Sequence, residues 1–254
     1  DMEILNSILD SISGDAPVVD VRRGLTWTAV VSRRVGLASS MVEKTGCNHG
    51  EGESREGAFT EMTALELARY CHDNDTTRAS LGLAAINSLL EIDPESYGAV
   101  DGLKIAYDLG KNKNISIIGH FPDMEALSGI ARNFWVIEKR PQPGDYTEEQ
   151  GDKLLPQSDI VIISSTTLIN HTLPGILERC RKDSVKMLLG PSTPLSRTLF
   201  DYGLDVLAGS VVTGKDKVLK SVSEGASFRQ IKMTGGIRFV SIIKDYDDII
   251  RRLS

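Results

Sequence analysis

The sequence predicts an α/β protein in which a doubly wound, mostly parallel sheet follows a smaller α+β domain. In the second half of the 254-residue chain, five short apolar segments start 19 to 26 residues apart with helical segments between them, as parallel strands and crossover helices do. In the first half, short segments rich in Val, Thr and Trp follow one another across brief turns, which is typical of an antiparallel sheet. The length suits two modest domains, which we place at residues 1–97 and 98–254.

The first domain begins with a helix and a small sheet. Apolar residues at helical spacing predict a helix over residues 3–12. Three strands are predicted next, at residues 18–21, 26–31 and 36–42. Residues 43–58 are rich in glycine and charge without any periodicity, which indicates a loop.

Two helices are predicted to complete the first domain, at about residues 61–71 and 77–90, because each has apolar residues along one face. Gly82 lies inside the second of them. A glycine costs a helix about 1 kcal/mol relative to alanine, so we expect another segment to pack closely against this position.

The apolar segments of the second domain are predicted to be its strands, at residues 115–118, 134–138, 160–163, 185–189 and 206–208. Residues 160–163 (IVII) are apolar on both faces, as a strand covered by helices on each side must be. Residues 147–150 (TEEQ) have the pattern of a capping box, which predicts the start of a helix there.

Charge and composition exclude several classes of function. With 29 Lys and Arg against 35 Asp and Glu the net charge is −6, and no cluster of basic residues is present, so we expect no binding to nucleic acid. No apolar segment approaches the roughly 20 residues that cross a bilayer, so we expect no membrane association. The three cysteines form no paired motif, and no signal pattern opens the chain, which favours a reducing, cytoplasmic location.

The candidate site lies where the predicted strands end. An open parallel sheet binds ligands beyond the carboxyl ends of its strands. The residues that follow the strands there and that we predict to contact a ligand are Gly119, Phe121, Glu138, Thr166, Thr167, Asn170, Gly190, Pro191, Ser192 and Thr193.

The loop after the first of these strands lacks the G-x-G-x-x-G fingerprint of dinucleotide-binding proteins. We therefore expect no NAD(P) or FAD bound through the usual pyrophosphate turn, and the sequence identifies no cofactor. Glu138 ends the second strand 19 residues after Gly119, a position from which an acid accepts hydrogen bonds from a ribose in related sheets. The alternative is a solvated charge at a strand end.

Three further loops each allow two interpretations. The hydroxyls of residues 164–167 suit an anion or a polar ligand, or they serve the turn itself. Asn170 offers donors and an acceptor to a flat polar ring, or it closes its own turn. Residues 190–195 (GPSTPL) let a backbone approach a ligand closely, or they begin a helix.

His120 is the candidate catalytic acid or base, because it directly follows the first strand and titrates near neutrality. The alternative is an ordinary hydrogen-bonded or exposed histidine. Cys47, His49 and His171 are weak candidates for metal ligands, since no pair has the spacing typical of zinc sites. These candidates leave a heavy or transition metal open as a cofactor, and they do not identify the metal.

Several segments resemble a heavy-metal-chelation family of uncharacterised prokaryotic proteins. They are residues 24–30 (GLTWTAV), 35–38, 80–87 (SLGLAAIN), 165–173 (STTLINHTL), 190–195 and 203–209. The resemblance implies an enolase N-terminal-like domain joined to a Rossmann-like domain, with a site between them to which Thr28 and Asn87 contribute. It also implies a role in chelation, through making or handling a flavin-, pterin- or tetrapyrrole-like chelator.

Three hypotheses follow. The first is a small-molecule enzyme or binding protein whose polar or heteroaromatic ligand lies between the domains, and the residues do not decide whether it catalyses a reaction. The second is direct binding of metal. The third is a non-catalytic assembly subunit, for which a homo-oligomer is expected.

Overall fold

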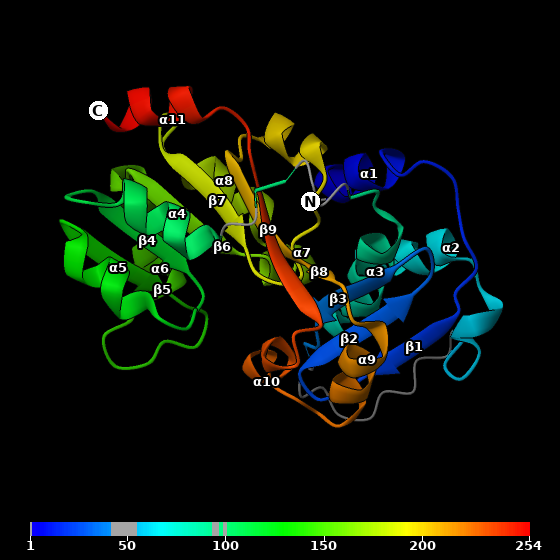
Figure 1. Cartoon of the computed structure of the whole chain (residues 1–254). Coiled ribbons are helices and arrows are strands. Elements are labelled where there is room, and N and C mark those ends of the chain that lie inside the picture. Colours follow the sequence, from blue (N-terminus) through cyan, green and yellow to red (C-terminus); the bar gives the residue numbers. More distant parts are fainter. Residues whose placement is uncertain (1, 42–54, 93–96, 99–100) are drawn as a thin grey trace.

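The computed structural model describes residues 2–41, 55–92, 97–98 and 101–254 (Figure 1). It has an α/β fold with two sheets, as predicted. The strands are β1 (Asp20–Arg23), β2 (Trp27–Val31), β3 (Val35–Ser39), β4 (Asn114–Ile118), β5 (Asn133–Ile137), β6 (Ile160–Ser164), β7 (Val185–Leu189), β8 (Val206–Val212) and β9 (Ile237–Ile243).

The helices are α1 (Met2–Asp10), α2 (Ala64–Ala68), α3 (Thr76–Leu89), α4 (Gly102–Leu109), α5 (Met124–Ile130), α6 (Glu148–Leu154), α7 (Thr166–Ile169), α8 (Leu173–Arg179), α9 (Lys215–Ser223), α10 (Phe228–Met233) and α11 (Tyr246–Leu253). Short 3-10 helices occur at η1 (Phe59–Glu61), η2 (Arg69–His72), η3 (Leu155–Gln157) and η4 (Arg197–Tyr202). In the part of the chain that the structure describes, no helix is both long and apolar enough to span a membrane.

The small sheet is antiparallel, in the order β1-β2-β3, and both of its faces are covered. All five residues of β2 are buried. Val30 packs toward α1 and α3, whereas Trp27 and Ala29 pack against α9 and α10 from the second half of the chain. Figure 1 shows α9 and α10 beside this sheet. The two halves of the sequence therefore share one core at the small sheet.

The large sheet has the order β5-β4-β6-β7-β8-β9. The strands β4 to β8 are parallel, so their carboxyl ends lie at one edge, as predicted. Helices cover both faces: Ile117 and Ile162 pack with α4, α5 and α11, while Val161 and Ile163 pack with α7 and α8. The sheet is thus doubly wound.

The strand β9, which pairs with β8 in antiparallel orientation, was not predicted from the sequence. Its first three residues are only half-buried, and Arg238 interrupts its apolar character, so it lacks the continuous apolar segment by which the other strands were recognised. As the last strand at one edge of the sheet, β9 needs less apolar surface than a central strand.

The strand order of the large sheet reverses at β4, which is its first strand along the chain. From β4 the chain passes to β5 on one side and then returns to β6 on the other. The connections after β4 and β6 therefore lead to opposite faces of the sheet, and a crevice opens between them at the carboxyl edge.

Gly82 lies where the backbone of η2 crosses α3. A β-carbon at this position would stand 2.0 Å from the Cys71 backbone nitrogen and 2.5 Å from the Tyr70 carbonyl carbon. Real β-carbon contacts are not that short, so only glycine allows the two backbones to meet. The close packing expected from the sequence is confirmed.

Gly82→Ala is expected to lower the free energy of unfolding by about 1–3 kcal/mol, because overpacking outweighs the gain in helix propensity. Gly175→Ala in α8 is the matched control, since a β-carbon there meets nothing within 4 Å. It is expected to be neutral or to stabilise the protein by up to about 1 kcal/mol. Urea-induced unfolding measures both changes. A Gly82→Ala variant as stable as the wild type would contradict the packing described.

Candidate functional site

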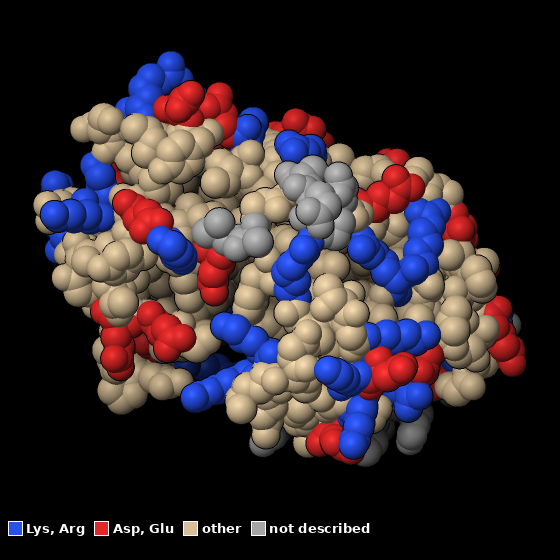
Figure 2. Space-filling model, in the orientation of Figure 1, with Lys and Arg blue, Asp and Glu red and all other residues tan. Residues whose placement is uncertain are grey.

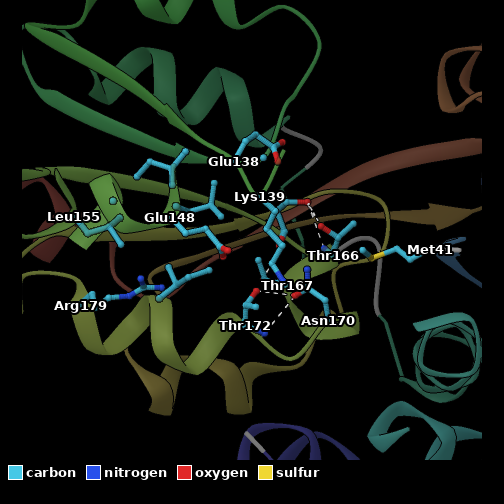
Figure 3. Close-up of a pocket in the computed structure, with 16 residues that line it drawn as sticks. Met41, Glu138, Lys139, Glu148, Leu155, Thr166, Thr167, Asn170, Thr172 and Arg179 are labelled. Carbon is cyan, nitrogen blue, oxygen red and sulfur yellow. Dashed lines mark hydrogen bonds between the residues drawn. The ribbon is translucent and has the colours of Figure 1, made fainter. Parts of the chain in front are cut away.

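A cavity of about 160 Å³ lies at the carboxyl ends of β4, β5 and β6, at the point where the strand order reverses (Figure 3). Polar and charged residues line it from the loops after the strands and from α6, α7 and α8. They are Glu138, Lys139, Glu148, Ser164, Thr166, Thr167, Asn170, Thr172 and Arg179, together with Gly119 and Gly151.

Apolar side chains form the walls of the cavity. Ile118 and Ile137 are the last residues of β4 and β5, and Leu155 and Ile176 come from η3 and α8. Met41, which follows β3, contributes from the first half of the chain. The cavity therefore lies between the large sheet and the first half of the chain, and flat apolar groups suit its walls.

Gly119 makes room for the site. It has φ +99°, a conformation that glycine adopts with little strain, and it lies against Ser164, whose Cβ would be 3.1 Å from a β-carbon at position 119. The chain can therefore turn away directly after β4 without a side chain that would fill the crevice.

Three charged side chains around the cavity lack a partner. Among the described residues, Glu138, Lys139 and Glu148 make no hydrogen bond or ion pair through their side chains. Glu138 is half-buried, whereas Lys139 and Glu148 are exposed. Figure 3 shows all three around the same space. Arg179 is held in place by the Gly175 carbonyl, 2.7 Å from its Nε, and by Asp152, 2.6 Å from its Nη1.

The residues that follow β6 form a network of hydrogen bonds. Thr167 Oγ1 donates to the Ser164 carbonyl at 2.7 Å, and Thr172 Oγ1 donates to Asn170 Oδ1 at 2.7 Å. These residues therefore close their own turns, and they also line the cavity, while their contact with a ligand stays a prediction. The Asn170 amide nitrogen has no partner among the described residues, so it can donate to a ligand.

His120 and Phe121 lie beside the cavity but do not line it. His120 Nε2 is 2.9 Å from Asp145 Oδ2, and that oxygen also accepts the Gln142 backbone N–H at 2.7 Å. Phe121 packs at the edge of the core between the sheet and α4 and α5. The loops after β4 and β5 are therefore joined at the rim of the site.

A second group of predicted residues joins the small sheet to the end of β7. Ser192 Oγ accepts the Ser39 backbone N–H at 2.8 Å, and Asn87 Nδ2 donates to the Ser192 and Leu37 carbonyls, each at 2.9 Å. Thr28 Oγ1 is 3.0 Å from Ser40 Oγ. These residues, with Gly190, Pro191 and Thr193, do not line the cavity. Ser192 and Asn87 instead join the end of β7 to the first half of the chain.

The alternative that residues 190–195 begin a helix is wrong. Residues 191–196 form no helix, and η4 begins only at Arg197. Gly190 has φ +130°, and the Ser165 hydroxyl would be 2.6 Å from a β-carbon there, so this glycine serves a tight turn after β7.

The metal candidates are only partly described. Cys47 and His49 lie outside the described residues, whereas His171 Nε2 is 2.8 Å from the Cys71 carbonyl oxygen. Burial raises the pKa of the Cys71 thiol to about 12 and that of Cys180 to about 11, so neither is a ready thiolate ligand. Within the described ranges, no three His, Cys, Asp or Glu side chains cluster so as to hold a metal ion.

Comparison with known proteins identifies the family of the chain. The profile of a family described as "Putative heavy-metal chelation" (DUF364) matches residues 101–241, more than half of the chain. The chain belongs to this family. A second profile with the same description (DUF4213) matches residues 5–90. The resemblance seen in the sequence is thereby confirmed.

Similar proteins of the family have no described activity. An uncharacterised protein of Methanocaldococcus jannaschii is 25% identical in an alignment of 226 residues, and the match covers 84% of this chain and 85% of that protein. The crystal structure of a DUF364 protein of unknown function from Desulfitobacterium hafniense has a TM-score of 0.80 and 25% identity, covering 95% of this chain and 98% of that one. One from Pyrococcus horikoshii has a TM-score of 0.80 at 23% identity, covering 94% and 99%.

The pair of His120 and Asp145 is expected to give the fold a pH-dependent stability. Burial alone raises the pKa of Asp145, but the hydrogen bonds from the Gln142 backbone and from His120 outweigh it and hold the pKa below the ordinary value of 3.8. A lowered pKa stabilises the fold above the unfolded-state pKa, and this contribution is lost as the pH falls through the folded-state value.

Asp145→Asn is therefore expected to lower the unfolding temperature at pH 7 by about 2–4 °C, and the difference from the wild type should shrink as the pH falls below 3.8 and through the folded-state pKa. Asp108→Asn is the control, because Asp108 pairs with Lys104 on a fully exposed helix surface, where an ion pair contributes little. Thermal unfolding followed between pH 2.5 and 8 tests this. A constant difference across that range would show that the Asp145 charge is unimportant.

Proposed function

We propose that the protein binds a small polar heteroaromatic molecule, of a kind that chelates metal, in the cavity at the carboxyl ends of β4, β5 and β6. One observation carries the proposal. Glu138, Lys139 and Glu148 have no partners among the described residues and surround a cavity with apolar walls at the reversal of strand order. A few polar groups that converge on a cavity with apolar walls, at the reversal of strand order, are typical of a ligand site.

The size of the cavity narrows the class of ligand. Its volume of about 160 Å³ is roughly half of the ~300 Å³ at which sites for drug-sized ligands begin. A ligand with two fused rings, such as a pterin, therefore suits it better than a three-ring flavin or a tetrapyrrole.

The walls and the rim would contact different parts of such a molecule. Ile137, Leu155 and Ile176 offer apolar surface to the faces of a ring. Glu138 can accept hydrogen bonds from ring N–H groups or from hydroxyls of a side chain, while Lys139 and the Asn170 amide can donate to ring carbonyls. The combination provides both donors and acceptors to a polar ring edge.

The cavity does not fit a bare heavy-metal ion. Soft metal ions prefer thiolate and imidazole ligands, and the described lining includes neither Cys nor His. We therefore expect any metal at this cavity to be bound by the organic chelator, with the protein recognising the chelator.

Catalysis would require a group that moves a proton. His120 is the candidate, because Asp145 orients its ring at the rim of the site. Its position beside the cavity suits proton exchange with a ligand that extends past Gly119. Binding and catalysis are separate parts of the proposal, and the first is tested by itself.

Neopterin, a fluorescent pterin with a hydroxylated side chain, is the probe of choice. Its fluorescence is expected to change saturably on titration with the protein. Glu138→Gln should weaken binding by about 10- to 100-fold, because a hydrogen bond to a charged group contributes about 1.5–3 kcal/mol. Glu178→Gln is the matched control, since Glu178 is exposed on α8 and does not line the cavity.

Two results would contradict the proposal. One is the absence of saturable binding for neopterin and also for adenosine and riboflavin. The other is neopterin binding that Glu138→Gln leaves unchanged.

A further inference from the structure

Met41 closes one end of the cavity. Among the described residues that line the cavity, it is the one that comes from the first half of the chain. Figure 3 shows Leu155 and Arg179 at one end of the space and Met41 at the other, with the Met41 side chain extending toward Thr166. The space that begins at η3 and α8 therefore ends at this half-buried side chain.

Hydrogen bonds from α3 fix the backbone of Met41. Its N–H donates to Ser80 Oγ at 3.3 Å, and its carbonyl accepts from Thr76 Oγ1 at 2.9 Å. The Ser80 hydroxyl in turn donates to the Thr76 carbonyl at 2.7 Å. Ser80 and Thr76 are both buried. These bonds form a closed network that ties the backbone of Met41 to the first two turns of a buried helix.

The two residues before Met41 are also held. The Ser39 backbone N–H donates to Ser192 Oγ at 2.8 Å, and the Ser40 backbone N–H donates to the Thr26 carbonyl at 2.9 Å. The main chain that leads to the cavity is therefore fixed from several sides. Only rotation about its own side-chain bonds can change how far Met41 reaches into the cavity.

We propose that Met41 determines the size of the ligand, and that Thr76 and Ser80 are the residues that position it. The inference rests on the proposed function and names the residue that selects a two-ring ligand over a three-ring one. The third ring of a flavin needs space beyond the cavity of about 160 Å³, and Met41 blocks one end of that cavity. Its thioether makes favourable contacts with the edge of an aromatic ring, so it also contributes to binding of a ligand that fits.

The test compares neopterin with riboflavin, both of which are fluorescent. The wild type is expected to prefer neopterin. Met41→Ala removes the side chain beyond Cβ, so it should weaken neopterin binding by about 10-fold. It should also strengthen riboflavin binding by about 10-fold or more, because the end of the cavity opens. Met41→Leu keeps the volume and should retain the preference of the wild type.

Two further variants complete this comparison. Met233→Ala is the matched control, because Met233 is 80% exposed on α10 and does not line the cavity. It should leave both affinities unchanged. Met41→Val keeps part of the side chain and should give an intermediate preference, which provides a second measurement if Met41→Ala folds poorly.

Ser80→Ala tests the positioning role. It removes the acceptor of the Met41 N–H, so it should shift the ratio of the two affinities toward riboflavin by about 3-fold or more. Ser88→Ala is its control, since Ser88 is equally buried on α3 but bonds to Ser32 and does not contact Met41. A loss of stability alone would not move the ratio, whereas a displaced Met41 would.

The outcomes separate this inference from the proposed function. Absence of saturable binding of every probe would overturn both. Neopterin binding whose preference over riboflavin survives in Met41→Ala and Met41→Val would overturn the role of Met41 alone. Equal binding of the two probes by the wild type would do the same.

Discussion

The parallel pairing of β4 with both β5 and β6 is the constraint from which the site follows. Neighbouring strands lie about 4.8 Å apart, so the ends of β5 and β6 both stand directly beside Gly119, which follows β4. Because the connections then diverge to opposite faces of the sheet, a cavity remains at this edge, lined in part by α6, α7 and α8. The face in Figure 2 is correspondingly hollowed between the lobe that holds β5 and the lobe that holds α10, and basic and acidic side chains are interspersed over it. The hydrogen bonds of three strands thus place Glu138 and Thr167 around one space.

The fold could be predicted from the sequence wherever burial leaves a local pattern. Strands such as β6 are apolar on both faces, and Gly82 in the middle of a helix signals a close crossing of two backbones. The strand β9 leaves no such signal because half of it is exposed at the edge of the sheet. Nor does any local pattern show that α9 and α10 cover the small sheet, since Val222 meets Gly24 across almost two hundred residues. Contacts of that kind depend on the whole topology.

The site was predictable to the extent that it depends on strand ends. Glu138, Thr167 and Asn170 follow strands β5 and β6 and lie around the cavity. Glu148 lines the cavity but was not predicted to do so. The capping box at Thr147 predicts where α6 begins, but it does not predict which direction the first turn of the helix faces. Ser192 follows β7, which is separated from β4 by β6. There the small sheet lies against the carboxyl edge, and the Ser39 backbone N–H donates to the Ser192 hydroxyl. The ends of the predicted strands therefore show which residues lie at the carboxyl edge of the sheet. Only the order of the strands in the sheet shows which of these loops remain accessible to a ligand.

The one-turn helix α7 stands between the cavity and the bond that joins His171 to Cys71. Asn170 lines the cavity directly after this helix, and the next residue, His171, faces Cys71 of the first half of the chain. Thr167 contacts both the cavity and the small hollow next to His171. The first half of the chain is therefore tied, through His171, to the segment that lies next to the cavity.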